Sequence, residues 1–298
     1  MFSGGGSIRA YFWHQNASSL PVNVALVAGG VSQIRNYRSQ RVSNGGGICL
    51  ADAQLYGSYD YLGTVPVGAD DIILPNSMAT LQFGQTAGFA AEFDVGLTLE
   101  TLLLRTVAWT GTAGGAPGTF WGPLAAMDGS HPRGSWGFSN CLLSGGSFDV
   151  APGVGSDTRQ ISCCAHGGAE EGSFPAPPFF PPDPSSADEG LFGVNLTYRF
   201  QVTNSSDAPH ELFVYLAAQN TPSDYFGAAK ILSPGTNPDK GVPPLRHGEQ
   251  NFVDLTTAAA QTIPPDPPVT VDVTVANGGG ATMPFLIILS KLNLRTNP

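Results

Sequence analysis

Hydrophobic and polar residues alternate along short stretches of this chain, and a period of two predicts β-strands. The segment Ser7–Ala28 shows the pattern clearly. Apolar residues alternate before Asn16, the sequence Asn-Ala-Ser supplies turn chemistry, and the alternation resumes after Pro21. The segment therefore predicts a strand, a polar turn and a second strand.

The same pattern occurs again about two thirds of the way along the chain. Asn195–Leu216 aligns without gaps on Ser7–Ala28, and Asn204 falls opposite Asn16 while Pro209 falls opposite Pro21. An ungapped match of this length indicates an internal repeat.

A second pair of similar segments follows at nearly the same separation. Ile72–Gly84 resembles Thr262–Thr274, with Ile73 opposite Ile263, and each segment reads as a proline-led turn that begins an alternating strand. Two matched pairs in the same order predict that one β-rich unit is duplicated.

The predicted fold class is therefore all-β: two duplicated antiparallel β-sandwich units, Ig-like or jelly-roll-like, joined by a Gly/Pro-rich middle segment. The first unit covers residues 1–109 and the second covers 191–298. The middle segment, 110–190, has loop-rich strands and ends in a proline-rich stretch, 173–190, which predicts a stiff extended linker.

Composition agrees with this architecture and adds one anomaly. The 298 residues include 38 glycines and 25 prolines, which suits short strands joined by turns. Charged residues make up only 12%, where about 25% is typical, and three lysines occur in all. Such a surface is either covered by neighbouring subunits or hydrated through uncharged polar residues. The first alternative predicts a homo-oligomer or polymer.

Charge and hydropathy exclude some partners and indicate a location. The net charge of −10 argues against nucleic-acid binding, which needs a basic surface, and no stretch is long and apolar enough for a membrane helix. The start of the chain lacks the pattern of a signal peptide. We expect either a cytoplasmic protein or the mature chain of an exported, extracellular or cell-surface protein, and the cysteines favour export.

The four cysteines are Cys49, Cys141, Cys163 and Cys164, and their spacing does not match a zinc site. Cys163 and Cys164 are adjacent, so we expect each of them to pair elsewhere, with Cys49 and Cys141 as partners. Disulfides are the favoured interpretation, and buried thiols are the alternative. No metal site and no cofactor are predicted.

One stretch, Gly129–Cys141, concentrates chemistry-bearing side chains in a short span. It does not fit the nucleophile elbow of a hydrolase, so a structural loop is favoured over a binding site. Aromatic residues crowd the surrounding segment, and sugars stack on tryptophan faces, although core packing is the more common role of such residues. The candidate ligand-binding residues, with glycans as the possible ligand, are Trp121, His131, Arg133 and Trp136.

Three N-x-[ST] sequons make Asn16, Asn195 and Asn204 candidate glycosylation sites. Two of the three, Asn16 and Asn204, fall at equivalent predicted turns. Turn chemistry explains that pair without a glycan, although an exposed turn is also where a glycan would lie.

Three motifs in order resemble a cyanobacterial family of exported proteins of unknown function. They are "NASSLPVNVALVAGG", "GTFWGPLAAMDGSHPRGSWGFSN" and "FGVNLTYRFQVTNSSDAPHELFVYL", and the family opens a similar final unit with "YGV-x-Y". The resemblance covers most of the chain. It implies export and a β-rich fold, and it carries no activity or functional residues to this sequence.

Together these features predict a non-enzymatic extracellular structural protein, a subunit of a surface layer, filament or coat. A carbohydrate-binding cell-surface β-sandwich protein is the alternative, and a virion structural protein is a variant of the first interpretation. A glycan hydrolase would need two facing carboxylates, and no motif in the sequence points to such a pair.

Overall fold

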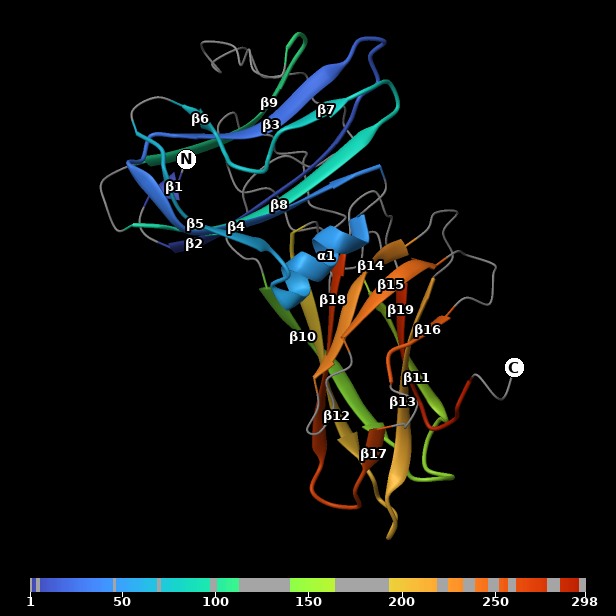
Figure 1. Ribbon diagram of the computed structural model, residues 1–298. Coiled ribbons are helices and arrows are strands. Elements are labelled where there is room, and N and C mark those ends of the chain that lie inside the picture. Colours follow the sequence, from blue (N-terminus) through green and yellow to red (C-terminus); the bar gives the residue numbers. More distant parts are fainter. Residues whose placement is uncertain are drawn as a thin grey trace. The chain divides into compact units, whose positions relative to one another are not determined.

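β-strands dominate the chain, as the alternating pattern predicts, and the all-β sandwich class is confirmed. The structure is a computed structural model. It describes residues 2–3, 6–44, 47–68, 71–96, 101–112, 140–163, 193–218, 225–232, 239–245, 252–256, 261–277 and 285–294. The strands form two compact units, one with β1 to β9 and the helix α1, the other with β10 to β19 (Figure 1). Within the described ranges, no helix is long and apolar enough to cross a membrane.

Two antiparallel sheets build the first unit. The first sheet has the order β2 (Gly6–Gln15), β8 (Thr86–Val95), β4 (Gln33–Ser43) and β5 (Asp60–Pro66). The second sheet has the order β1 (Phe2–Ser3), β9 (Thr101–Trp109), β3 (Val22–Gly29) and β6 (Ile72–Ile73), and β7 (Ala79–Leu81) also pairs with β3.

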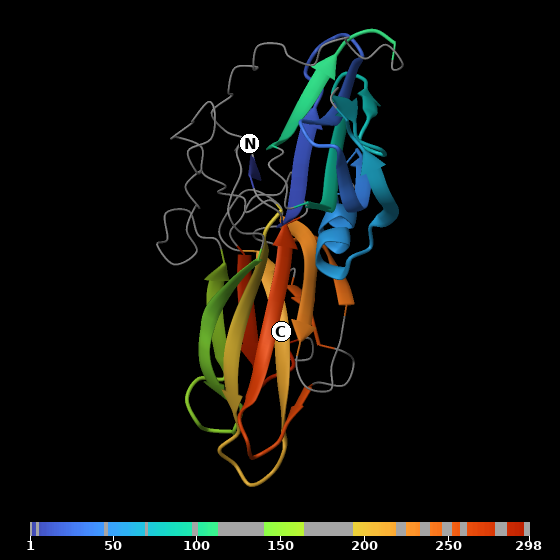
Figure 2. The ribbon, with the colours of Figure 1, turned by 90° about the vertical axis from the view of Figure 1, so that its left-hand side faces the viewer.

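The second unit also has two sheets. One has the order β10 (Asn140–Asp149), β12 (Asn195–Thr203), β18 (Val269–Asn277), β14 (Tyr225–Leu232) and β15 (Asp239–Leu245). The other has the order β11 (Thr158–Cys163), β19 (Phe285–Ser290), β13 (His210–Ala218) and β16 (Phe252–Asp254), and β17 (Gln261–Ile263) also pairs with β13. Figure 2 shows β10, β12 and β18 side by side in green, gold and red.

The two units share one topology. Strands β2 to β9 of the first unit correspond to β12 to β19 of the second, each counterpart having a number ten higher, and the neighbours within each sheet correspond as well. Val22 pairs with Leu81 just as His210 pairs with Ile263. The predicted duplication, with Ser7–Ala28 matching Asn195–Leu216, is confirmed at the level of strand order and register.

The second predicted alignment is wrong by eight positions. Ile263 lies on β17 and corresponds to Leu81 on β7, whereas Ile73 lies on β6 and pairs with Val27. Both segments contain a proline next to alternating apolar residues, and that pattern matches at more than one register. Only the strand pairing distinguishes the registers.

Strands from the predicted middle segment extend the sheets of the second unit. β10 pairs with β12 in parallel, and β11 pairs with β19 in antiparallel fashion. β10 adds an outer strand to the β12 sheet, and a parallel pair is the one departure from the antiparallel arrangement in the described strands.

The core of each unit follows from the alternation. Phe12, Phe89 and Phe93 face the interior of the first unit, and the rings of Phe12 and Phe89 stack with centres 5.2 Å apart. In the second unit, Tyr198 and Phe200 are among the largest fully buried side chains. Burial of each such side chain contributes roughly 1.5–3 kcal/mol, so one apolar face on each sheet is enough to hold the sandwich together.

The helix α1 (Gly47–Tyr56) is not part of the predicted pattern, and it covers the outer face of the β4–β8 region. Its Leu50 is fully buried in a small cluster with Ala90, and Trp13 packs against the same cluster. Gly88 on β8 makes this close packing possible. A Cβ atom at Gly88 would lie 2.3 Å from a ring carbon of Trp13 and 2.6 Å from a methyl carbon of Leu50.

We expect Gly88→Ala to lower the free energy of unfolding by about 1–3 kcal/mol, because the added methyl overpacks the interface between α1 and the sheet. Urea denaturation followed by circular dichroism measures the change. The matched position in the second unit is Thr270, since Gly88 pairs with Trp13 as Thr270 pairs with Gln201. Thr270→Ala should cost less than about 0.5 kcal/mol. Equal effects of the two substitutions would contradict this account.

Candidate binding groove at the Asn204 turn

A buried asparagine organises the turn between β12 and β13, which lie in opposite sheets of the second unit. The Asn204 side chain is only 3% exposed. Its Nδ2 donates to the carbonyl oxygens of Ala208 (2.8 Å) and Ile263 (2.9 Å), and its Oδ1 accepts from the backbone N–H of Ser206 (3.1 Å). The amide thus joins the turn to β17 and fixes the crossing from one sheet to the other.

The first unit repeats this arrangement atom for atom. Asn16, 5% exposed, donates from Nδ2 to the carbonyl oxygens of Leu20 (2.8 Å) and Leu81 (2.9 Å), and its Oδ1 accepts from the N–H of Ser18 (2.8 Å). The Ser18 hydroxyl donates to the carbonyl of Leu20 at 2.9 Å, just as the Ser206 hydroxyl donates to that of Ala208.

These contacts correct two of the predicted glycosylation sites. The amide nitrogens of Asn16 and Asn204 are buried and give their hydrogens to two carbonyls each, so a glycan on either nitrogen is incompatible with this fold. Asn195 differs, because its side chain is half-buried and its Nδ2 donates to Asn140 Oδ1 in an exposed contact of 3.1 Å. Whether Asn195 carries a glycan stays a prediction.

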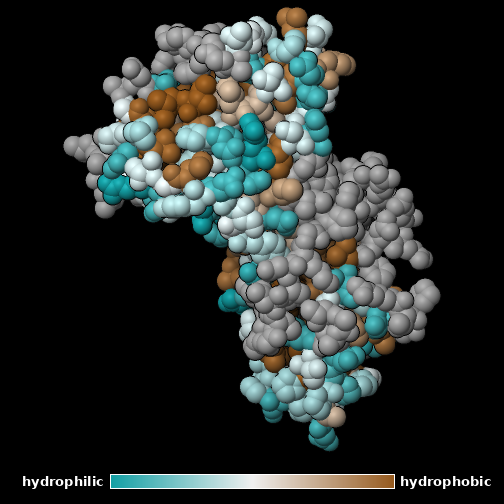
Figure 3. All heavy atoms as spheres, in the orientation of Figure 1, coloured by the Kyte–Doolittle hydropathy of each residue, from teal (hydrophilic) through white to brown (hydrophobic). Residues whose placement is uncertain are grey.

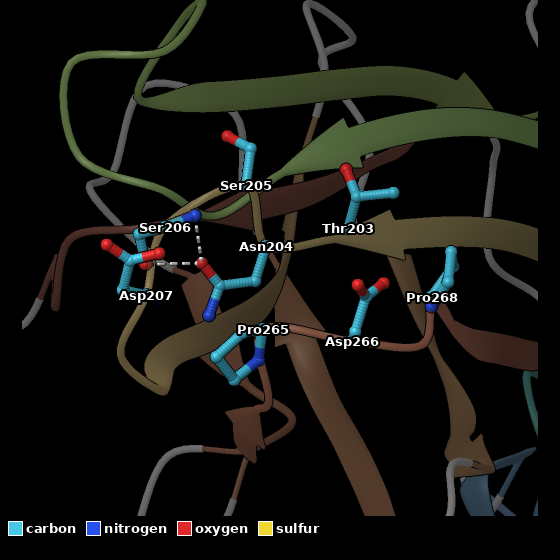
Figure 4. A pocket seen from close by; sticks show the side chains of 8 residues that line it. All are labelled: Thr203, Asn204, Ser205, Ser206, Asp207, Pro265, Asp266 and Pro268. Carbon is cyan, nitrogen blue, oxygen red and sulfur yellow. Dashed lines mark hydrogen bonds between the residues drawn. The ribbon is translucent and has the colours of Figure 1, made fainter.

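The turn in the second unit borders an open groove of about 350 Å³ (Figure 4). We call it the Asn204 groove. In Figure 4 the carboxylate of Asp266 projects from the proline turn, while Asp207 lies on the other side of Asn204. The groove is lined by Thr203, Asn204, Ser205, Ser206, Asp207, Pro265, Asp266 and Pro268.

The matching place in the first unit is closed by backbone hydrogen bonds. Asn16 donates its N–H to the carbonyl of Gln85 (2.9 Å), and Gly84 donates its N–H to the carbonyl of Asn16 (2.8 Å). Gln85 also donates its N–H to the carbonyl of Gln82 (3.0 Å). These bonds draw the β7–β8 turn onto the Asn16 turn.

Prolines in the β17–β18 turn explain why the matching place in the second unit is not closed by backbone hydrogen bonds. The turn from β17 to β18 has five residues, where the β7–β8 turn has four, and it reads Pro-Pro-Asp-Pro-Pro, so only Asp266 has a backbone N–H. Within the described ranges, no backbone hydrogen bond joins this turn to Asn204. The Asn204 side chain reaches Ile263, the last residue of β17 before the proline turn, and the space between the two turns forms the groove.

Asp149, at the end of β10, supports one wall of the groove. Its Oδ1 accepts from the N–H groups of Ala151 (2.9 Å) and Ser205 (3.2 Å). Burial acts to raise the pKa of Asp149, but these N–H donors and the nearby Lys291 outweigh it, and the pKa lies below its ordinary value. The carboxylate therefore holds Ser205 in place at the rim.

A second polar cluster lies on the β2–β8–β4 sheet of the first unit. Glu92 accepts from Arg9 Nε at 2.8 Å and from Arg38, so one carboxylate joins three adjacent strands. The Arg38 guanidinium lies 5.5 Å from the centre of the Tyr59 ring, and burial raises the pKa of Tyr59 above its ordinary value. Ion pairing on both sides gives Glu92 a structural role in holding the strands.

The predicted ligand-binding residues Trp121, His131, Arg133 and Trp136 lie outside the described residues. The structure holds Cys49 and Cys141 as thiols, so the predicted disulfides to these two residues are not formed. Cys49 is exposed on α1, and Cys141 lies half-buried on β10 against the core of the second unit. Cys163 ends β11, and its side chain lies outside the described residues, as does Cys164.

The groove residues Asp207 and Asp266 were not predicted from the sequence. Alignment of the two repeats could have pointed to them, because the first unit has Ser19 at the position of Asp207 and Gly84 at the position of Asp266. In the part of the chain that the structure describes, no group of three or more His, Cys, Asp or Glu side chains is arranged to hold a metal ion.

Comparison with known proteins gives little to set beside this geometry. No protein-family model matches the chain, and no curated protein matches it. One solved structure that aligns with this chain is the CUB1-EGF-CUB2 domain of human MASP-1/3. The alignment covers 97% of this chain and 99% of the MASP-1/3 chain, at 9% sequence identity and a TM-score of 0.19. A likeness at that TM-score carries no argument about function, and the resemblance to an exported cyanobacterial family stays a prediction.

We expect Asn204→Ala to lower the free energy of unfolding by about 2 kcal/mol, because it removes the two hydrogen bonds that the amide donates, one of them the buried bond to the Ile263 carbonyl. Urea denaturation followed by tryptophan fluorescence measures the loss. Asn195→Ala is the control: it also removes a sequon, but its contact is exposed, so the cost should stay under about 0.5 kcal/mol. A similar cost for both variants would contradict the structural role of Asn204.

Asp149 should make stability depend on pH in the acid range. Its pKa is lowered in the folded state, so its contribution is present above the ordinary value of 3.8 and is lost as the pH falls through the folded pKa. We expect Asp149→Asn to lose less stability than the unmodified chain between pH 5 and about pH 2. Urea midpoints at each pH test this, and parallel curves for the two proteins would contradict it.

Proposed function

We propose that this protein is a non-enzymatic structural protein of the cell surface or extracellular space. It self-associates as a subunit of a surface layer, filament or coat. The observation that carries the proposal is an exposed edge strand, β5, at the end of a sheet in a unit whose sequence from β1 to β9 contains no lysine.

Polar side chains of the second unit support a structural role, because they pair with one another across strands. Arg199 on β12 makes a two-point ion pair with Asp272 on β18, at 2.8 and 2.7 Å. The neighbouring rungs of the same two strands are linked in the same way: Thr197 with Thr274 (2.9 Å) and Gln201 with Thr270 (3.2 Å). Cross-strand pairs of this kind stabilise a sheet.

The edge strand β5 supports self-association. Tyr61 and Leu62 are 67% and 43% exposed, and most other positions of the strand are exposed as well. Both side chains add exposed apolar surface at this edge, where the pairing between β5 and β4 is irregular. Proteins that stay monomeric protect such an edge with lysines, prolines or β-bulges. β5 has an irregular pairing with β4 and ends at Pro66, but it carries no lysine, and Asp60 is its one charged residue.

Surface composition points the same way. Charged residues are about half as frequent as usual, and Figure 3 shows hydrophobic residues gathered on the first unit over the region of β3, β6 and β9. Contiguous apolar surface on a soluble protein often marks a contact with another chain.

An alternating pattern does not by itself mark an edge strand, as Thr270–Val275 shows. These residues belong to β18, which is flanked by β12 and β14 and is therefore an inner strand. Its backbone already pairs on both sides, so it cannot pair with another chain. β5 differs in this respect, because it lies at the end of its sheet and pairs with β4 alone among the described strands.

We expect Leu62→Lys to dissociate the assembly, because a lysine on an edge strand opposes pairing with a second edge. Multi-angle light scattering at rising protein concentration measures the particle mass. Thr270→Lys is the matched control, since it places the same charge on an inner strand and should leave the particle mass unchanged. An unmodified chain that stays monomeric at high concentration would contradict the proposal, as would equal dissociation by both variants.

A further inference from the structure

We propose that the Asn204 groove binds a neutral sugar residue of a glycan. The inference concerns the tip of the second unit, and it stands independently of the self-association proposed for the β5 edge. The proposal rests on the side chains that line the groove and on the residues that differ between the two units at this place.

The duplication separates what the fold requires from what it does not. Asn16 and Asn204 make the same contacts, so the asparagine and its serine partner are structural in both units. Three of the residues around them are replaced by more polar ones. Ala17, Ser19 and Gly84 of the first unit are replaced at the matching positions by Ser205, Asp207 and Asp266. None of these replacements is needed to form the turn, because the first unit forms it without them.

The groove offers the mixture of groups that a sugar uses. Sugar hydroxyls both donate and accept hydrogen bonds. The carboxylates of Asp207 and Asp266 accept, and the hydroxyls of Thr203 and Ser205 donate or accept. Pro265 supplies an apolar wall against which the C–H groups of a sugar ring can pack.

Size favours a small organic ligand over a bare ion. The groove measures about 350 Å³, near the lower end of the roughly 300–1,000 Å³ typical of small-molecule sites. A calcium ion needs about six to eight oxygen ligands close around it, whereas the two carboxylates of the groove lie on opposite sides of Asn204 (Figure 4).

Charge favours a neutral sugar over an acidic one. Asp207 and Asp266 line the groove, no lysine or arginine lines it, and the chain carries a net charge of −10. A uronic or sialic acid would bring a further negative charge to this surface and be repelled.

A glycan array tests the proposal on the full chain. It should carry neutral hexose and N-acetylhexosamine oligosaccharides beside uronate-bearing ones, with titration calorimetry of the best neutral probe afterwards. We expect binding to neutral probes only, in the presence of either calcium or a chelator. Asp266→Asn and Asp207→Asn should each weaken binding about tenfold, because each converts a charged acceptor into a neutral one.

Matched controls make the result decisive. Ser19→Ala, at the position that corresponds to Asp207, should leave the affinity unchanged. Asp266 is exposed and makes no described contact in the core, so urea midpoints of Asp266→Asn should equal those of the unmodified chain. The proposal is overturned by an array without neutral-sugar binding at millimolar concentration, by unchanged affinity in both aspartate variants, or by binding of calcium alone. Because strand pairing at β5 is measured by particle mass, failure here leaves the proposed assembly standing.

Discussion

The fold of each unit depends on one buried asparagine at the point where the chain crosses between sheets. β2 and β3 lie in opposite sheets, as do β12 and β13, so no backbone ladder can hold the turns that connect them. Backbone groups at such a crossing need side-chain partners, because a buried polar group without a partner costs about 1–3 kcal/mol. Asn16 and Asn204 supply the donors from a single side chain, and each reaches the short strand that completes the second sheet. Asparagine suits this place because its amide donates twice and accepts as well.

Once that crossing is fixed, the surrounding residues are free to change, and the two units differ there. The first unit adds α1 on the outside of its sheet and uses Gly88 to admit it, whereas the matched Thr270 of the second unit faces outward and pairs with Gln201. The first unit seals its tip with backbone hydrogen bonds, and the second opens its tip with prolines. The same core thus supports a covered face in one copy and a groove in the other.

Alternating hydrophobicity predicted the sandwich and the first repeat, because a period of two and an ungapped match depend only on local residues. The second repeat was misaligned, since Ile73 and Ile263 both stand near a proline but pair with different parts of the sheet. The helix was not predicted, because Leu50 is buried by a tertiary contact with Ala90. Such a contact produces no periodic pattern in the local sequence. The groove residues Asp207 and Asp266 required the correct alignment before their difference from the first unit was visible.

The placement of apolar and acidic residues at the two tips shows how far the copies have diverged in surface chemistry. Leu20 and Phe83 are 58% and 71% exposed at the tip of the first unit, and the matching positions in the second unit are Ala208 and Pro265. The asparagine contacts use only the backbone carbonyls of Leu20 and Ala208, so the side chains at these positions can change without loss of those contacts. A duplicated sandwich can therefore change what its tip contacts without any loss of core packing, because strand edges, sheet faces and tips are separate surfaces. The proposed recognition at a tip and the proposed assembly at an edge therefore depend on different residues of the sequence.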